Sequence, residues 1–174
     1  MFGTDPSQVV GVIAGGPVAL TTAVEGAEDD EAVAVHDLDA LGLTADDLVV
    51  GISASGRTPY VIAAILEARR RSALSVSVAC NPDSAAGREA HIAFDAEFIA
   101  RSTRLRAGTA QELVLSMLTA LAMVRCNKNY DNCMVDVRAT NESLVARSFS
   151  LAQYRTGPAS SEVAAALEVA DGVV

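Results

Sequence analysis

Short apolar runs alternate with longer segments of helical periodicity along most of the chain. The clearest runs are Leu48–Ile52 and Leu74–Ala79, with Gln8–Ala14 as a third and His91–Phe94 as a shorter candidate. Leu48–Ile52 contains no polar residue, which is typical of a strand that is buried on both faces of a parallel sheet. Strands that alternate with helical patterns predict an α/β fold in which helices wrap a parallel sheet.

Helices are expected between and after these runs: from Pro17, over Glu28–Asp39, from Pro59, and over Thr109–Arg125, Thr140–Gln153 and Glu162–Ala170. The segment Thr109–Arg125 is apolar over a wide arc, so it is either deeply packed or shared with a second subunit. Because an exposed apolar stripe of that length is a liability in a monomer, we expect a homodimer formed through this helix.

The composition is that of a folded domain. The chain has 174 residues, of which 51% are hydrophobic and 20% charged, and a mean hydropathy of +0.30. Enough apolar surface is available to offset the entropy of ordering, which excludes a disordered chain. We expect one domain over residues 1–150, followed over residues 151–174 by a linker and the start of a helical C-terminal part. No run approaches the roughly 20 apolar residues of a membrane span, and no leader pattern opens the chain, so the expected location is the cytoplasm.

Charge and rare residues exclude several classes of partner. The net charge is −9 and aromatic residues make up 4% of the chain, a combination that disfavours nucleic acid. The three cysteines lack a C-x-x-C spacing, and there are only two histidines, His36 and His91. We therefore expect neither a metal nor another cofactor, and the cysteines are interpreted as small packing residues.

The strongest local signal for a binding site is the segment after the run Leu48–Ile52. Three hydroxyl residues surround one glycine and one arginine there: Ser53, Ser55, Thr58, Gly56 and Arg57. In open parallel sheets, ligands bind where the carboxyl end of a strand is followed by the N-terminus of a helix, whose free amides attract phosphate. The alternative interpretation is an ordinary turn in which one hydroxyl caps the helix that starts at Pro59. Capping accounts for one hydroxyl, and three exceed that need.

Two charged segments are further candidates. Three arginines stand close together just before the expected helix Thr109–Arg125, at Arg101, Arg104 and Arg106. They could clamp an anionic sugar phosphate, or they could be a basic surface segment. An acidic run from Glu25 to Glu31 is, by default, a charged helix start that complements the helix dipole. A carboxylate from this run could also act as a general base, although the residues alone do not single one out.

Taken together, these segments resemble the N-acetylmuramic acid 6-phosphate etherases, which belong with the sugar isomerase (SIS) domain proteins and the glucokinase regulatory protein. The resemblance runs in order along nearly the whole chain and rests on FGTDP, VIAGG (Val12–Gly16), AVEGAED (Ala23–Asp29), VVGISASGRTPYVI (Val49–Ile62), CNP (Cys80–Pro82), STRLRAGTAQELVL (Ser102–Leu115) and MVDVRATNESL (Met134–Leu144). It implies an α/β/α sandwich of the SIS type, incomplete here, with trailing C-terminal helices.

The resemblance also implies an activity and a set of site residues. Such lyases cleave the D-lactyl ether of N-acetylmuramic acid 6-phosphate to N-acetylglucosamine 6-phosphate and D-lactate, without a metal. Carried over by position, Glu28 is the proton-abstracting base and Glu25 orients it. Ser53–Thr58 matches the sugar-phosphate-binding loop, and Ser102, Thr103 and Arg104 match a second contact segment.

The chain departs from the family pattern at its start. The family has a first strand, a GTSGR phosphate loop and a DASE carboxylate upstream of FGTDP, so the resemblance implies that the proton donor to the leaving group and a central strand are missing. The chain then looks like the middle of an etherase, from a truncated gene, a misplaced start or a split protein. Three functions remain open: an etherase, a non-catalytic regulatory module that binds a sugar phosphate, and an inactive remnant.

Overall fold

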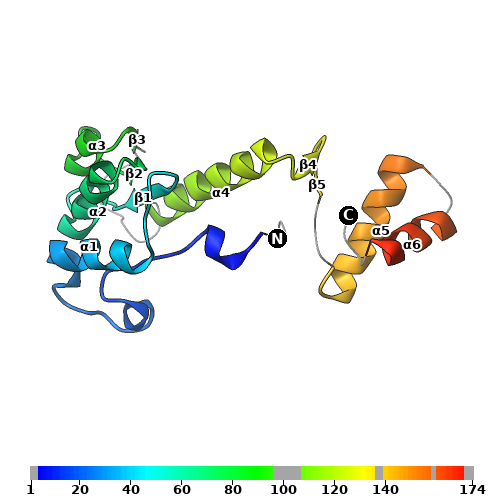
Figure 1. Ribbon diagram of the computed structural model, residues 1–174, viewed down its shortest axis with the longest axis horizontal. Coiled ribbons are helices and arrows are strands. Elements are labelled where there is room, and N and C mark those ends of the chain that lie inside the picture. The colour runs from blue at the N-terminus through cyan, green and yellow to red at the C-terminus, as the bar shows by residue number, and fades with distance from the viewer. Residues whose placement is uncertain (1–3, 96–106, 136–138, 158–159, 171–174) are drawn as a thin grey trace. The chain divides into compact units, whose positions relative to one another are not determined.

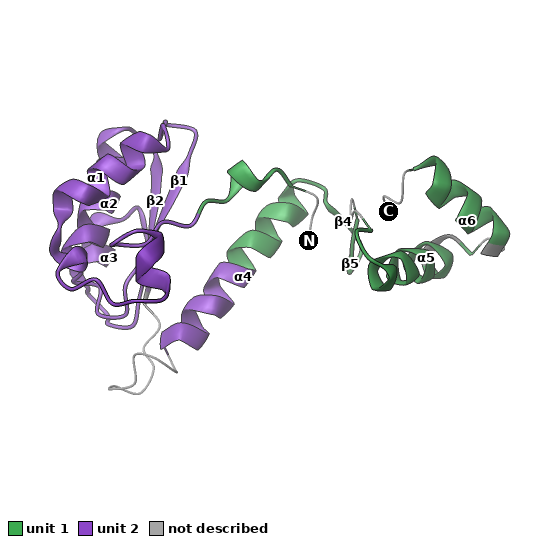
Figure 2. Cartoon of the chain, turned by 90° about the horizontal axis from the view of Figure 1, so that it is seen from below, with its two compact units in different colours: residues 1–10, 117–174 green, residues 11–116 purple. Residues whose placement is uncertain are grey.

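The computed structural model describes residues 4–95, 107–135, 139–157 and 160–170 (Figure 1). These residues form two compact units, which Figure 2 colours separately. One unit comprises residues 11–116 and contains the sheet with its helices. The other unit comprises residues 1–10 and 117–174. The predicted division at residue 150 stays a prediction.

The sheet of the first unit is parallel and has three strands in the order β1-β2-β3. The strands are β1 (Leu48–Ile52), β2 (Leu74–Ala79) and β3 (Ile92–Asp95). Leu48 pairs with Leu74, and Val76 pairs with Ile92. The α/β class and the parallel sheet are confirmed, and β3 lies one residue later than the sequence pattern placed it.

Helices α1 (Glu31–Ala40), α2 (Pro59–Arg70) and α3 (Ala85–Glu89) accompany the sheet (Figure 1). Helix α2 packs on β1 and β2, α3 packs on β2 and β3, and α1 packs on α2. The contact between sheet and α2 is close, because a Cβ at Gly51 would lie 2.8 Å from Cδ1 of Ile65. Ile65 itself is fully buried. Helix α2, together with the loop that precedes it, is therefore packed tightly against the sheet.

The predicted strand Gln8–Ala14 is wrong. A 3-10 helix, η1 (Pro6–Gln8), occupies its beginning, and the residues after it form no strand. Val9 is 65% exposed and Val10 is 52% exposed. An apolar run becomes a strand only where a neighbouring strand accepts its backbone hydrogen bonds, and no described strand pairs with this one.

The acidic helix also begins later than predicted. Asp30 caps α1 by accepting hydrogen bonds from the amides of Ala32 and Val33 at 3.0 and 3.1 Å. Glu28 therefore lies outside α1, in the 3-10 helix η3 (Ala27–Asp29). The helix expected from Pro17 is likewise a short 3-10 turn, η2 (Pro17–Leu20).

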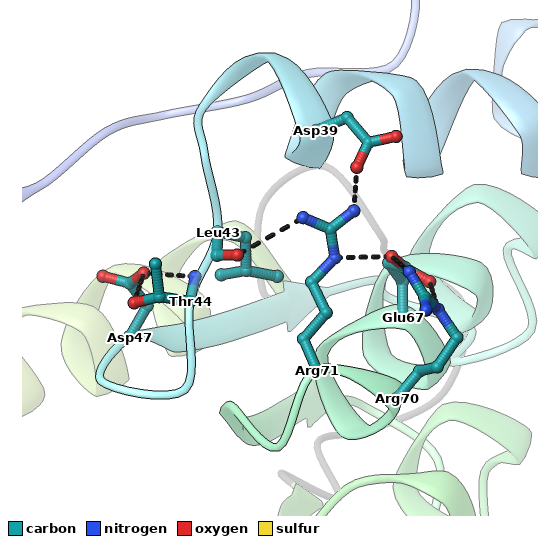
Figure 3. Close-up of polar contacts among 7 residues, drawn as sticks. All are labelled: Asp39, Leu43, Thr44, Asp47, Glu67, Arg70 and Arg71. Carbon is teal, nitrogen blue, oxygen red and sulfur yellow. Dashed lines mark hydrogen bonds and ion pairs between the residues drawn. The ribbon is translucent and has the colours of Figure 1, made fainter.

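A cluster of hydrogen bonds around the buried carboxylate of Glu67 joins the end of α2 to the end of α1 (Figure 3). Glu67 is 6% exposed and accepts from Nε and Nη2 of Arg70 at 2.7 and 2.6 Å. Arg71 Nε also donates to Glu67, at 2.6 Å, and the same guanidinium donates to Asp39 and to the carbonyl of Leu43. The hydrogen bond from Arg70 lowers the pKa of Glu67 below its usual range.

This cluster predicts a loss of stability in acid. Because the pKa of Glu67 is lowered in the folded state, its contribution is present above the ordinary carboxyl pKa and is lost as the pH falls through the lowered value. Replacing Glu67 by Gln is expected to cost about 2 kcal/mol at neutral pH, since charged hydrogen bonds are lost. Urea unfolding of both proteins from about pH 7 to about pH 3 checks this, and the difference between them is expected to shrink in acid. A difference that stays constant over that range would contradict the assignment.

The remaining elements follow in chain order. They are α4 (Gly108–Arg125), β4 (Asn129–Tyr130), β5 (Cys133–Met134), α5 (Glu142–Thr156) and α6 (Ser160–Val169). Strands β4 and β5 form a short antiparallel hairpin, and α5 packs against α6. Asn141 caps α5 by accepting from the amide of Leu144 at 2.9 Å. The three predicted helices are confirmed to within a few residues. In the described ranges, no helix combines the length and the apolar character that a membrane crossing requires.

Candidate functional site

The loop Ser53–Thr58, called here the hydroxyl loop, joins the carboxyl end of β1 to the first residue of α2. Ser53 is buried and its amide donates to the carbonyl of Val78 at 3.1 Å, which continues the pairing of β1 with β2. The loop thus begins from a fixed backbone position at the edge where parallel sheets bind ligands.

The side chain of Ser53 contacts the other two hydroxyls of this loop. Ser53 Oγ lies 2.8 Å from Thr58 Oγ1 and 3.3 Å from Ser55 Oγ. The amide of Gly56 donates to Ser53 Oγ, and the amide of Arg57 donates to Ser55 Oγ, both at 3.1 Å. The side chain of Ser53 therefore braces the turn, while Ser55 and Arg57 lie at its exposed rim.

Hydrogen-bond counting shows what this cluster offers to a ligand. The three hydroxyls hold one proton each, and their mutual contacts use two of these protons. Ser53 Oγ already accepts from the amide of Gly56. When Ser55 donates to Ser53 and Ser53 donates to Thr58, the proton of Thr58 stays free. When the direction is reversed, the proton of Ser55 stays free. The cluster can therefore direct a hydroxyl donor outward at either end, as binding an anion requires.

The start of α2 is not capped by a side chain. Thr58 is the N-cap residue, yet its hydroxyl makes no capping hydrogen bond and lies against Ser53 instead. Pro59 has no amide proton, so the next donors of the first turn belong to Tyr60 and Val61. The alternative in which one loop hydroxyl caps the helix is thereby contradicted. An uncapped N-terminus of a long helix, beside three hydroxyls, suits a phosphate group.

The segment after β2 holds the hydroxyl loop from the other side. Asn81 Nδ2 donates to the carbonyl of Ser55 at 2.9 Å, and the amide of Ala86 donates to the carbonyl of Gly56 at 2.9 Å. Gly56 has a φ of +63°, and a Cβ there would lie 2.3 Å from Cβ of Ser84. In the sequence, Asn81 was noted only as part of the CNP motif (Cys80–Pro82), and Ser84 was not singled out. Their position directly after a neighbouring strand of the same parallel sheet is the signal that could have placed them beside the loop.

The predicted carboxylates lie on a different segment. Glu28 belongs to η3, which packs against α2, and Glu25 lies in the turn just before it. Both side chains are exposed. Among the residues that the structure describes, no hydrogen bond or ion pair joins either carboxylate to the hydroxyl loop. The structure thus brings the loop residues together and places Glu28 on an element that contacts the same helix.

A partly buried pair, Tyr60 and Asp37, fixes α1, which directly follows η3, to the first turn of α2. Tyr60 is 7% exposed, and its hydroxyl donates to Oδ2 of Asp37 at 2.5 Å. Burial and this hydrogen bond raise the pKa of Tyr60 well above its ordinary value, so the phenol stays protonated. This hydrogen bond therefore fixes α1, the helix that follows the element bearing Glu28, to the start of α2.

The second contact segment, Ser102, Thr103 and Arg104, lies outside the described residues, as do Arg101 and Arg106. Within the ranges that are described, no group of three or more His, Cys, Asp or Glu side chains is arranged to hold a metal ion.

Comparisons with known proteins agree with the resemblance seen in the sequence. Residues 2–69 match the family model of the glucokinase regulatory protein N-terminal SIS domain. Over 99% of the chain, 55% of residues are identical to an N-acetylmuramic acid 6-phosphate etherase from Streptomyces avermitilis. Proteins of the same name from Mycolicibacterium smegmatis and Serratia proteamaculans are 50% and 51% identical over 98% and 95% of the chain. The chain spans 57 to 59% of the length of these relatives. The predicted family resemblance is confirmed.

Proposed function

We propose that this chain forms the sugar-phosphate-binding part of an N-acetylmuramic acid 6-phosphate etherase. The premise is that it aligns with such etherases over 95 to 99% of its length. The observation that carries the proposal is the uncapped start of α2 beside three hydroxyls. The substrate would be N-acetylmuramic acid 6-phosphate, and the products N-acetylglucosamine 6-phosphate and D-lactate.

The proposed reaction is an elimination followed by addition of water. Opening of the sugar ring exposes an aldehyde at C1, which acidifies the proton on C2. A base removes that proton, the C2–C3 double bond forms, and the lactyl oxygen leaves C3 with the bonding electron pair. Water then adds at C3 of the unsaturated aldehyde. These steps need a base, an acid and an anchor for the phosphate.

We assign these roles from the resemblance to the etherases and, for the hydroxyl loop and the start of α2, also from their geometry. The hydroxyl loop and the first amides of α2 bind the phosphate, with Arg57, and with Ser102–Arg104 as a second contact. Glu28 removes the C2 proton and Glu25 orients it. The proton donor to the leaving lactate has no counterpart among the assigned residues, and we place it in the part of the etherases that this chain does not match.

Titration calorimetry with N-acetylmuramic acid 6-phosphate, combined with a lactate assay, tests the proposal. The wild-type chain is expected to bind, and Thr58→Val is expected to weaken binding about tenfold, because it removes one hydroxyl while keeping the side-chain shape. Thr44→Val, on the α1–β1 loop, serves as the matched control and should bind normally. Equal affinity of the Thr58→Val variant and the wild type would contradict the phosphate site.

A second candidate function has support of its own. The family model that matches residues 2–69 describes a domain of a regulatory protein, and such a module needs the hydroxyl loop without the catalytic carboxylates. Heat of binding without lactate release would favour this non-catalytic module. Absence of binding would favour an inactive remnant.

We further propose that the protein forms a homodimer through α4 in the cytoplasm. Four apolar side chains form an exposed stripe on this helix: Leu113, Met117, Leu121 and Val124 are 57%, 56%, 62% and 45% exposed. Their spacing of three and four residues puts them on one face of the helix, where a second copy would bury them.

The dimer predicts a defined effect of one charge. Leu121→Glu is expected to convert the dimer to a monomer in sedimentation velocity, because a charge would be buried in the apolar interface. Ala122→Glu adds the same charge one residue further on, about 100° around the helix axis from Leu121 and outside the stripe, and should leave the dimer intact. A wild-type chain that sediments as a monomer at the same concentration would refute the interface.

A further inference from the structure

Asn81 stands where the loops after two neighbouring parallel strands meet. It follows Cys80 directly after β2, and the amide of Cys80 donates to the carbonyl of Ala54 at 3.1 Å. Its own Nδ2 donates to the carbonyl of Ser55 at 2.9 Å. The side chain is nevertheless exposed. Asn81 therefore lies at the open rim of the hydroxyl loop.

The side-chain amide of Asn81 has hydrogen-bonding capacity left over. An asparagine side chain carries two N–H donors and one carbonyl acceptor. One donor is used on Ser55, and among the described residues no other hydrogen bond of this side chain is present. A second N–H and the carbonyl oxygen Oδ1 remain, beside the Ser55 end of the hydroxyl chain.

The backbone around Asn81 is held on both sides. Pro82 fixes the following φ angle, and Ser84 caps α3 by accepting from the amide of Gly87 at 3.0 Å. The side chain of Ser84 also fills the space that a Cβ at Gly56 would need. The backbone that carries Asn81 and the hydrogen bond of its amide to Ser55 are thus in place before any ligand arrives, which lowers the entropy that binding has to offset.

We propose that Asn81 is a specificity-determining residue that hydrogen-bonds a neutral polar group of the sugar, a hydroxyl or the acetamido group, while the hydroxyl loop holds the phosphate. A phosphate accepts hydrogen bonds from donors only, and the carbonyl oxygen of an amide that faced the phosphate would repel it. A group that both donates and accepts matches the free N–H and Oδ1 of Asn81. The inference rests on the proposed phosphate site, which supplies the anchor that brings the sugar to this rim.

Titration calorimetry with two probes, N-acetylglucosamine 6-phosphate and inorganic phosphate, tests the inference on the full chain. Asn81→Ala is expected to weaken the sugar phosphate about tenfold and inorganic phosphate less than about twofold, because only the sugar touches the amide. The discrimination between the probes is the readout, since damage to the loop alone would weaken both equally.

Two results would overturn the inference while leaving the phosphate site in place. One is an equal loss of affinity for both probes in Asn81→Ala, which would make Asn81 a support for Ser55 only. The other is unchanged affinity for both. If the wild-type chain binds neither probe, the proposed function fails as well, so the two failures are distinguishable. A circular dichroism melt of the variant confirms that it is folded in each case.

Discussion

Replacing Glu28 by Gln is expected to abolish D-lactate release from N-acetylmuramic acid 6-phosphate while substrate binding is retained. An amide cannot take the C2 proton, and loss of a general base typically lowers turnover by about a hundredfold or more. The phosphate anchor lies on the hydroxyl loop and not on η3, so the dissociation constant should change less than about twofold. The measurement is a lactate assay under conditions in which the wild-type protein releases lactate, with calorimetry on the same samples.

The acidic neighbourhood of Glu28 provides a matched control. Glu31→Gln removes the same charge from an exposed glutamate in the first turn of α1 and should leave turnover unchanged. Glu25→Gln is expected to have an intermediate effect, in keeping with an orienting role. Lactate release by Glu28→Gln at the wild-type rate would exclude Glu28 as the base.

Replacing Gly56 by Ala is expected to cost about 3 kcal/mol of stability and to eliminate sugar-phosphate binding. Gly56 has a φ of +63°, and a new Cβ would lie 2.3 Å from Cβ of Ser84 and 3.0 Å from Cβ of Ala79. The left-handed backbone costs about 1 to 2 kcal/mol for a residue with a side chain, and overpacking adds about 1 to 3 kcal/mol. The loop must therefore move away from the segment after β2, which displaces the hydroxyls. Urea unfolding and calorimetry measure the two effects.

Gly42→Ala separates the backbone cost from the steric cost. Gly42 has a φ of +70°, and nothing lies within 4 Å of the position its Cβ would take. This control variant should lose about 1 kcal/mol and keep its binding affinity. If Gly56→Ala is no less stable than Gly42→Ala, the close approach to Ser84 does not hold the loop.

The sequence was informative wherever local pattern and tertiary environment agree. Strand β1 is a short run without polar residues and β2 alternates apolar residues with Ser75 and Ser77, and both lie where the pattern placed them because each has a parallel neighbour. The hydroxyl loop was recognisable for the same reason, since its residues are consecutive and their contacts are local. Helix α4 was predicted to within one residue from its apolar periodicity.

Features that depend on distant partners were not predictable in the same way. The run Gln8–Ala14 has strand character, yet the described sheet supplies no partner for its backbone. The bond from Tyr60 to Asp37 spans 23 residues, and the one from Asn81 to Ser55 spans 26. Neither follows from the spacing of residue types, because both depend on how the elements pack. The position of the Glu28 carboxylate relative to the loop is set by the same kind of packing.

The central claim is that phosphate binds at the hydroxyl loop and the first turn of α2. Backbone amide NMR, with N-acetylglucosamine 6-phosphate titrated into the isotope-labelled chain, tests it most directly. The account predicts that the largest shifts occur at the amides of Gly56, Arg57, Tyr60 and Val61, with smaller shifts at η3. Saturating shifts confined to other segments, with these amides unmoved, would contradict it.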